Sequence, residues 1–367
     1  MSSCASACAG RPLRCGSTTA AELGDYSGYR KALVPVPEDL RPLPLDSTGA
    51  QGGSARGWQA VVLSWNGRED TLRCLESLTR VEPPGLGVIC VDNGSTDGSA
   101  QAVSERFPQV ELIEAGANLG YAGGNNLGLR RALERGARWA VLVNNDATVA
   151  SDVIAGFERA IAERPKAGIL AGKVYFADRP QTIWFAGQRV SELLGYSGRP
   201  RGYGRSDGPR YSRVGSTGRA VGALMAISRD AIEAVGLLDE ELFAYVEDVD
   251  WALRVRRAGM EVVFAPGARA WHRVSASTGG EAASTHTIYY GVRNTVTVLE
   301  RRRPLGRLRS ALRRAAILAA FSFHAITRSN RREALSAVRA GFGDARRGRL
   351  GLRPSRTYQR SPERDGR

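Results

Sequence analysis

Residues 58–79 read WQAVVLSWNGREDTLRCLESLT, and they set the pattern of the whole fold. Trp58–Ser64 is a short, mostly apolar run, which is typical of a buried strand. A polar turn is predicted at Asn66-Gly67, because Asn and Gly together favour turns, and residues 68–79 are predicted to form a helix. A strand, a turn and a helix therefore follow one another here.

The same alternation continues toward the C-terminus. Strands are predicted at Leu86–Val91, Val110–Ile113 and Trp139–Val143, and helices up to Phe107, over Ala122–Arg135 and over residues 151–163. This order predicts an α/β fold with a mostly parallel, doubly wound sheet. Ligands of such sheets bind at the carboxyl ends of the strands, so the polar residues at those ends are the candidate site residues.

The flanking regions follow other patterns. Residues 1–57, rich in Gly, Ser, Pro and Ala, are predicted to be a disordered extension. Strand-like runs at 168–176 and 219–228 flank a Gly-, Arg- and Tyr-rich stretch, 195–215, which is predicted to be a mobile loop, and two further strands are predicted at 261–265 and 268–272.

The positive charge of the chain is concentrated in its C-terminal tail. The net charge is +15, and residues 301–367 hold 19 Arg but only 4 acidic residues, so the rest of the chain is neutral. Such a tail suits an anionic membrane surface or a nucleic acid, but the neutral body lacks the basic footprint of nucleic-acid-binding proteins. We therefore expect no nucleic-acid partner. Leu305–Thr327 has apolar positions with Arg around them, which favours a helix lying in the membrane interface; the alternative is a helix docked on the rest of the protein.

Cysteine usage and hydropathy predict a cytoplasmic location. The five cysteines are odd in number and none has C-x-x-C spacing, which favours a reducing compartment without disulfides. The N-terminus lacks a basic start followed by an apolar run, and no apolar span approaches about 20 residues. Neither a secretory signal nor a transmembrane helix is predicted.

The first polar motif is Val91–Ser99, VDNGSTDGS. Asp92 ends a predicted strand, where its carboxylate can accept a hydrogen bond from a nucleobase imide N–H or a ribose hydroxyl. Repulsion between negative charges makes it a poor phosphate ligand. Asp97 or Ser95 can cap the following helix, so part of this motif has a purely structural explanation.

The second motif is Asn118–Gly128, NLGYAGGNNLG. The paired glycines Gly123 and Gly124 stand near a predicted helix start, where backbone can approach a ligand closely and the helix N-terminus favours anions. The spacing matches neither the G-x-G-x-x-G dinucleotide fingerprint nor the G-x-x-x-x-G-K-[ST] phosphate loop.

The third motif is Leu142–Ala147, LVNNDA, an apolar strand that ends in a carboxylate. Asp146 in this position suits a hard divalent cation shared with phosphate oxygens, and an Asx turn is the structural alternative. His272 is the only histidine at the end of a predicted strand. It is a candidate second metal ligand, and a hydrogen-bonded core histidine is the alternative.

The fourth motif is an acidic cluster, Glu247, Asp248 and Asp250, at the start of an amphipathic segment. One acid suffices to cap a helix, and adjacent carboxylates repel one another. Such a cluster is typical of a metal site, a proton acceptor, or both. Asp250 and Arg254 are spaced to form an i,i+4 pair.

Together these motifs resemble the inverting family 2 glycosyltransferases of the GT-A fold, over residues from about Trp58 to Thr297. Further segments that fit are Gly222–Met225 (GALM), Gly236–Glu240 (GLLDE) and Tyr289–Asn294 (YYGVRN). Within the family the chain looks most like bacterial rhamnosyltransferases that build polysaccharide on lipid carriers. The resemblance implies a GT-A domain over 58–300, with a nucleotide-binding half at 58–147 and an acceptor and catalytic half at 148–300. Basic amphipathic helices would follow at 301–350 and a disordered tail at 351–367.

The resemblance also implies roles for single residues. Asp248 would be the catalytic base, and Asp146, with His272, would hold a divalent cation, Mg²⁺ or Mn²⁺. Because Asn144 stands where many relatives have Asp, the donor diphosphate would supply most of the metal coordination. The donor-binding residues implied are Asn66, Asp92, Asn118, Gly124, Asn145 and Arg293, although for Arg293 a structural ion pair is an equal alternative.

The expected activity is therefore inverting sugar transfer from a nucleotide-sugar to a hydroxyl of a lipid-linked or polysaccharide acceptor, with L-rhamnose from dTDP-rhamnose as the first choice. Another UDP- or dTDP-sugar is one alternative. A sugar-phosphate nucleotidyltransferase is a second, but Trp58–Asp70 lacks the basic Gly-rich loop that a triphosphate would need. The expected location is the inner face of the bacterial plasma membrane, as a peripheral protein.

Overall fold

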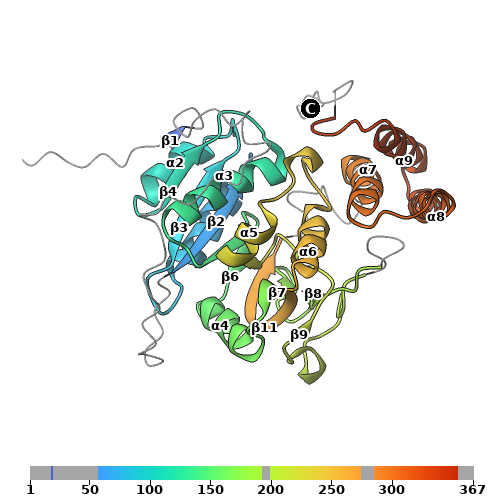
Figure 1. Ribbon diagram of the computed structural model, residues 1–367. Helices are drawn as coiled ribbons and strands as arrows, with labels where there is room; N and C mark the ends of the chain where they lie inside the picture. Colours follow the sequence, from blue (N-terminus) through green and yellow to red (C-terminus); the bar gives the residue numbers. More distant parts are fainter. Residues whose placement is uncertain (1–17, 20–56, 192–198, 274–284, 354–367) are drawn as a thin grey trace, which may run out of the picture.

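The computed structural model describes residues 18–19, 57–191, 199–273 and 285–353 (Figure 1). Its strands are β1 (Thr18–Thr19), β2 (Trp58–Ser64), β3 (Gly87–Asp92), β4 (Glu111–Glu114), β5 (Trp139–Asn144), β6 (Ala147–Val149), β7 (Ala167–Phe176), β8 (Ile183–Phe185), β9 (Gly215–Ser216), β10 (Met225–Ser228) and β11 (Glu261–His272). Its α-helices are α1 (Arg68–Thr79), α2 (Ser99–Arg106), α3 (Gly120–Glu134), α4 (Val153–Glu163), α5 (Arg229–Val235), α6 (Glu247–Arg257), α7 (Thr285–Arg302), α8 (Arg307–Ile326) and α9 (Arg331–Arg346).

The described strands form one mixed sheet, ordered β1-β4-β3-β2-β5-β10-β7-β11-β6, with β8 and β9 paired to β7 and β11. The run from β1 to β5 is entirely parallel. In its register Ser64 pairs with Asp92 and Leu63 pairs with Asn144, so β2, β3 and β5 end at the same edge. Asp92 and Asn144 are thus two strands apart, or about 10 Å. The parallel α/β sheet predicted from the alternating pattern is confirmed in this half.

Helices cover both faces of the parallel strands, because neighbouring strand residues point to opposite sides. Ser64 Oγ lies 2.9 Å from Thr71 Oγ1 of α1. Its neighbour Leu63 points the other way, toward α3, where a Cβ on Gly124 would collide with it. The same helix face carries Gly128, where a Cβ would meet Val61. Small residues therefore let α3 lie close to β2.

The second half of the sheet differs from the prediction in two places. The strand expected over 219–228 is only β10, residues 225–228, because residues 219–224 form the turn that carries the chain into it. The two strands expected at 261–265 and 268–272 are one strand, β11, whose pairing with β7 shifts register between Ala265 and Arg269. Beyond that irregularity β11 also pairs with β6, which brings His272 opposite Ala147.

The C-terminal helices pack as a group on the catalytic half. α7 contacts α6, and α8 and α9 pack against α7 and against each other (Figure 1). Their shared core contains Tyr289, Tyr290, Ala334 and Val338. The boundary predicted near residue 300 falls inside α7, because α7 contacts α6 and also packs against α9. Among the described residues, no helix combines the length and apolar character needed to cross a bilayer.

Several predicted segments lie wholly or partly outside the described residues. Of 1–57, only Thr18–Thr19 and Gly57 are described, and the first two form β1 beside β4. The predicted loop 195–215 is described from residue 199, with a short 3₁₀ helix at Pro209–Tyr211. Of the predicted tail 351–367, residues 351–353 are described.

Candidate active site

Asp92 ends β3 in the middle of the parallel edge. Its side chain is buried, and Oδ2 accepts a hydrogen bond from Ser95 N at 3.0 Å, which shapes the β3–α2 turn. Oδ1 has no hydrogen-bond partner among the described residues. A buried acceptor without a partner is unfavourable unless a ligand satisfies it. Asp92 thus offers one oxygen to a hydrogen-bond donor such as a nucleobase N–H.

The loops beside Asp92 are held by amide side chains. Asn66 Oδ1 accepts from Thr96 N at 2.8 Å, which joins the loop after β2 to the loop after β3. Asn118 Oδ1 accepts from Gly120 N at 2.9 Å and from Asn93 Nδ2 at 3.1 Å, at the start of α3. Asn66 and Asn118 therefore shape the rim of the site, and direct contact with a donor stays a prediction.

Gly124 and Asn145 have structural explanations in this fold. Gly124 lies inside α3, four residues after its start, and its missing side chain makes room for Leu63 of β2 rather than for a ligand. The close approach of Leu63 explains the glycine at this position, and the donor-binding role of Gly124 stays a prediction. Asn145 Nδ2 donates to Thr71 Oγ1 at 3.0 Å, so its side chain anchors α1 to the turn between β5 and β6.

Asp146 and His272 come together from distant parts of the chain. Asp146 lies in the β5–β6 turn, and His272 ends β11, which pairs with β6. His272 Nε2 is 2.9 Å from Asp146 Oδ1, and both side chains are buried. Neither ring nitrogen of His272 has a hydrogen bond of good geometry within the described residues. Asn144 Oδ1, two residues before Asp146, is likewise buried without a partner.

This arrangement fits part of a divalent-cation site. A carboxylate oxygen and an imidazole nitrogen that face each other at 2.9 Å are ligand types that Mn²⁺ and Mg²⁺ accept. Within the described residues no group of three or more His, Cys, Asp or Glu side chains forms a complete metal site. Among the described residues, the ligands offered here are one carboxylate and one imidazole, with Asn144 where many relatives have a second acid.

The acidic cluster begins α6, and its members have different environments. Asp248 Oδ2 accepts a hydrogen bond from Arg219 Nη1 at 2.9 Å. This ion pair was not predicted from the sequence. Asp250 is fully buried and paired with Arg254 and Arg302, so it holds the helix in place. Burial and the neighbouring Asp248 raise the pKa of Glu247 to about 8. At neutral pH, Glu247 therefore keeps its proton beside the Arg219-paired Asp248.

Tyr121 shows that the separate motifs converge. Burial raises the pKa of its phenol, and the charges of Glu247, Asp248 and Asp146 raise it further. Only a side chain close to all three carboxylates would respond to them. Tyr121 is in the first turn of α3, three residues after Asn118, and Asn118 accepts a hydrogen bond from Asn93, the neighbour of Asp92 in the chain. A Cβ on Gly222 would meet both Tyr121 Oη and Asn144 Oδ1, so Tyr121 lies near the end of β5, within electrostatic reach of Asp146 and Asp248.

Tyr121 and Arg219 are site residues that sequence reasoning missed. Tyr121 stands in the middle of the NLGYAGGNN motif, so its place beside the glycines was the available signal. Arg219 begins the stretch 219–228 that the sequence predicts as a strand, and a strand there would not bring its side chain to Asp248 of α6. The approach of Arg219 depends on the turn at 219–224.

Glu247→Gln should stabilise the protein increasingly as the pH rises. The pKa of Glu247 is about 8 in the folded protein against 4.5 for the free group, so the folded state binds more protons between these values and its free energy of unfolding falls with pH. Gln has no such titration. The advantage of the variant should grow to about 1–3 kcal/mol at pH 8. Urea unfolding at pH 5 and pH 8 measures it, and a difference that does not change with pH would contradict the assignment.

Arg293 is placed in the protein core. It is 1% exposed, and its guanidinium donates to Leu242 O at 2.8 Å, Gly351 O at 2.7 Å and Asn294 Oδ1 at 2.8 Å. It also lies over the ring of Tyr290. All three guanidinium nitrogens bind protein oxygens, and two of these bonds join α7 to the loop before α6 and to the residues after α9. These contacts favour the structural alternative for Arg293, and a donor-binding role stays a prediction.

Arg293→Ala should destabilise the fold by about 2–4 kcal/mol, because it empties the space of a buried side chain and leaves Asn294 Oδ1 without the donor it has in wild type. The fraction of the Arg293→Ala variant that is folded should bind a nucleoside diphosphate as tightly as wild type does. Urea unfolding and calorimetric titration of the nucleotide separate the two effects. Arg346→Ala, an exposed arginine of α9, is the matched control and should change stability by less than about 0.5 kcal/mol. Lost nucleotide affinity with unchanged stability would support the donor-binding role.

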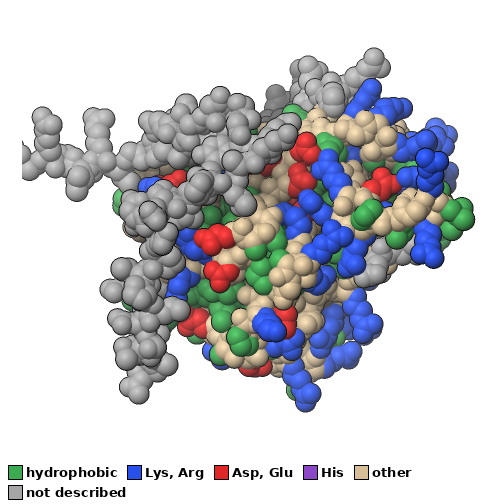
Figure 2. Space-filling model, viewed as in Figure 1, with side chains coloured by type: hydrophobic (Ala, Val, Ile, Leu, Met, Phe, Trp, Pro, Cys, Tyr) green, Lys and Arg blue, Asp and Glu red, His purple; other side chains and the backbone are tan. Residues whose placement is uncertain are grey.

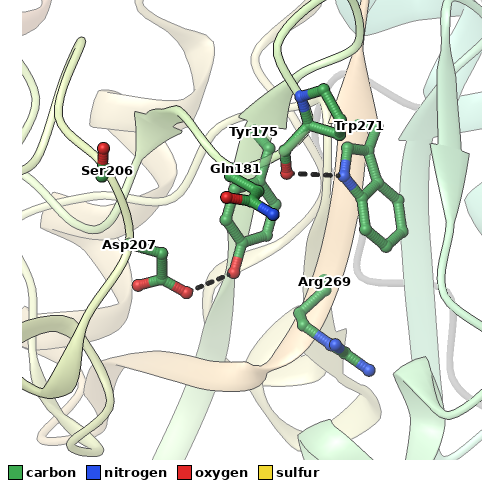
Figure 3. A pocket seen from close by; sticks show the side chains of 7 residues that line it. Tyr175, Gln181, Ser206, Asp207, Arg269 and Trp271 are labelled. Carbon is green, nitrogen blue, oxygen red and sulfur yellow. Dashed lines mark hydrogen bonds between the residues drawn. The ribbon is translucent and has the colours of Figure 1, made fainter.

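A separate cavity of about 270 Å³ lies on the other face of the sheet (Figure 3). Its lining includes Tyr175, Asp207 and Trp271, and it contains none of the predicted site residues. Trp271 precedes His272 in β11 and points to the opposite side of the strand. Asp207 binds Tyr175 Oη at 2.6 Å and Lys173 Nζ at 2.9 Å, so its carboxylate is satisfied within the protein.

Known proteins are similar to this chain in sequence. Residues 60–236 match the sequence model of Glycosyl transferase family 2. The chain is 32% identical over 231 residues, 58% of its length and 74% of the relative, to an N-acetylglucosaminyl-diphospho-decaprenol L-rhamnosyltransferase from Mycobacterium tuberculosis. It is 25% identical over 248 residues, 66% of its length and 79% of the relative, to the dTDP-rhamnosyl transferase RfbF from Shigella flexneri.

The fold is also found among solved structures. GalNAc-T7, crystallised with UDP, GalNAc and Mn²⁺, superposes with a TM-score of 0.52 at 15% identity, covering 66% of this chain and 47% of that one. That likeness concerns the GT-A fold alone. The sequence matches make the assignment: the chain belongs to glycosyl transferase family 2 and is a hexosyltransferase of the rhamnosyltransferase-like type.

Proposed function

We propose that the protein transfers L-rhamnose from dTDP-rhamnose, with inversion at the anomeric carbon, to a hydroxyl of a lipid-linked saccharide. The observation that carries this proposal is the shared strand edge at which β3 ends in Asp92 and β5 leads into Asp146, which faces His272 at 2.9 Å. The charges of Asp146 and Asp248 both act on Tyr121, which supports placing the acidic start of α6 at the same site. The rhamnose donor and the lipid-linked acceptor are supported by the names of the relatives in Mycobacterium tuberculosis and Shigella flexneri. The fold and the acids are equally compatible with another dTDP- or UDP-sugar.

Asp248 is the base in this proposal. As the acceptor oxygen attacks the anomeric carbon from the face opposite the nucleotide, its proton passes to Asp248, and the bond from that carbon to the diphosphate oxygen breaks. One displacement inverts the stereochemistry. Burial and the adjacent Asp248 raise the pKa of Glu247 to about 8, which favours its protonated form at neutral pH, so the proposal gives the role of proton acceptor to Asp248. Arg219 fixes the orientation of Asp248 through the bond at 2.9 Å.

Asp146 and His272 would hold the divalent cation, with the donor diphosphate as the other source of ligands. A bound cation would stabilise the charge that develops on the leaving diphosphate. The buried pair of Asp146 Oδ1 and His272 Nε2, together with Asn144 Oδ1, which has no partner among the described residues, supports this location. The carboxylate suits both Mg²⁺ and Mn²⁺, whereas Mg²⁺ prefers oxygen ligands to an imidazole nitrogen.

Asp92 would select the nucleotide. Its partnerless Oδ1 suits the imide N–H that uracil and thymine share, and cytosine lacks this donor at the corresponding position. Asn66 and Asn118 hold the loops on either side, so the pyrimidine would meet a preformed rim. This assignment leaves the choice between thymidine and uridine to other contacts.

A donor screen tests the proposal. Purified protein is incubated with Mn²⁺, a bacterial membrane lipid extract and one nucleotide-sugar at a time, and the released nucleoside diphosphate is measured. The proposal expects turnover with dTDP-rhamnose that depends on the extract. Turnover only with another nucleotide-sugar would correct the donor, whereas release of pyrophosphate from a nucleoside triphosphate and a sugar phosphate would indicate a nucleotidyltransferase.

A further inference from the structure

We propose that one face of α8 is a docking surface for an anionic lipid bilayer. The surface, named here the α8 strip, consists of exposed apolar side chains: Leu308, Ala311, Leu312, Ala315, Ala319, Phe323 and Ile326. It deepens the proposed function, because a lipid-linked acceptor is presented at a bilayer surface.

The positions of the strip follow helical geometry. Ala311 and Leu312 stand three and four residues after Leu308, and each later member stands three or four residues after the one before it. This spacing places all of them on one side of an α-helix. From Leu308 to Ile326 the strip is about 27 Å long. The opposite side of α8 faces the protein, with Arg313, Ile317 and Ala325 buried. The helix is therefore anchored by one face and presents an apolar face to solvent.

The exposure of the strip is large for side chains of this kind. Leu308 is 74% exposed, Leu312 61%, Phe323 69% and Ile326 50%. Four of the eight large apolar side chains that are exposed in the described part of the chain belong to this one helix. Single exposed apolar residues need no explanation, but a contiguous row on one helix face is typical of an interaction site.

The charges around the strip select an anionic occupant. α8 contains no acidic residue, and exposed Arg307 and Arg309 stand at its beginning. Arg331 and Arg332, also exposed, begin α9 directly after the strip ends. In Figure 2, Lys and Arg side chains gather on the side of the molecule where α8 and α9 lie, with apolar side chains among them. An apolar row flanked by arginines matches acyl chains beneath phosphate head groups.

Other occupants fit less well. A second copy docking through the same strip would bring two arginine-rich surfaces together, which is unfavourable. The N-terminal segment 1–56 carries six basic and five acidic residues, so it has no net negative charge with which to cover the arginines. Nucleic acid would match the arginines but not the apolar row between them.

The place of α8 suits an enzyme that works at a membrane. α7 lies between α8 and α6, and Asp248 is in the first turn of α6 (Figure 1). Docking through the strip would fix the catalytic half at a constant height above the bilayer through packed helices. A loose amphipathic tail could not do this.

Vesicle sedimentation with the full chain tests the surface. Wild type should bind vesicles that contain phosphatidylglycerol, bind pure phosphatidylcholine much more weakly, and be released by salt as the arginines are screened. The double variant Leu312→Gln/Phe323→Gln should partition about 10- to 100-fold less, because two apolar side chains no longer enter the bilayer. Leu352→Gln removes an apolar side chain of similar exposure, 64%, outside α8, and should bind as wild type does.

The substituted side chains are exposed, so loss of binding with an unchanged melting temperature excludes unfolding. Equal partitioning of wild type and the double variant would overturn the proposal. So would a wild type that binds no vesicles but forms a dimer, measured by light scattering, which the double variant cannot form. The assay contains neither donor nor acceptor, so this inference can fail while the proposed transfer reaction stands.

Discussion

Asp248→Asn should slow sugar transfer by about 10²–10⁴-fold, the contribution typical of a positioned general base. Asn has the same shape but cannot accept the proton of the attacking hydroxyl. The bond from Arg219 can persist to the remaining amide oxygen, so the start of α6 should stay in place. We expect the affinity for the nucleoside diphosphate to change less than about twofold, because Asp248 lies on the acceptor side of the reacting carbon in this mechanism.

The matched control is Glu247→Gln, which changes the adjacent carboxyl group in the same way. Because the pKa of Glu247 is about 8, this residue is already neutral at pH 7, and Gln should preserve most of the activity. Steady-state release of nucleoside diphosphate, together with calorimetric titration of the nucleotide, measures both variants. If Asp248→Asn turns over at the rate of wild type while Glu247→Gln is inactive, the two residues exchange roles.

Asp146→Asn should weaken binding of Mn²⁺ in the presence of the nucleoside diphosphate and reduce transfer by on the order of 10²-fold or more. A cation that neutralises the leaving diphosphate contributes several kcal/mol to the transition state, and Asp146 is the acid placed to hold it. His272→Ala should weaken Mn²⁺ binding in the same direction, because its Nε2 faces Asp146 Oδ1 at 2.9 Å. Electron paramagnetic resonance of free Mn²⁺ gives both affinities without an activity assay.

The converse variant is Asn144→Asp. Asn144 Oδ1 is buried without a partner and lies two residues before Asp146, so a carboxylate there would add a ligand charge to the same place. Mn²⁺ should bind about tenfold more tightly to this variant, since ligand charge raises affinity for hard cations. Mn²⁺ binding that is unaffected by all three substitutions would show that His272 is a core histidine and that the metal site lies elsewhere.

Local pattern predicted the parallel half of the fold closely. The strand expected at Trp58–Ser64 and the helix expected at 68–79 have those bounds in the structure. Apolar runs and turn residues suffice there, because each strand of a parallel sheet is buried on both faces and each connection is short. The mixed half of the sheet, in which β11 runs parallel to β7 and β10 runs antiparallel to its neighbours, was less predictable. The irregular pairing of β11 and the turn before β10 depend on partners far away in the sequence.

The candidate site was predictable only where a side chain sits at the end of a strand or helix. Asp92, Asp146 and His272 end strands or follow them directly, and Asp248 begins a helix, so the sequence marked them. The sequence could not show that Gly124 and Arg293 have structural contacts, because glycine and arginine occur in packing as readily as in ligand binding. Only the neighbours of each residue decide between these uses: Leu63 for Gly124, and three oxygen atoms for Arg293.

The sequence by itself determined the family, the order of the strands and helices, and the acids available for catalysis, because these follow from residue type and spacing along the chain. The tertiary structure decided which acid keeps its proton, which arginine pairs with the other acid, and which face of α8 meets solvent. Those properties arise from burial and from contacts between residues far apart in sequence. Charge and exposure depend on surroundings that only the folded chain creates.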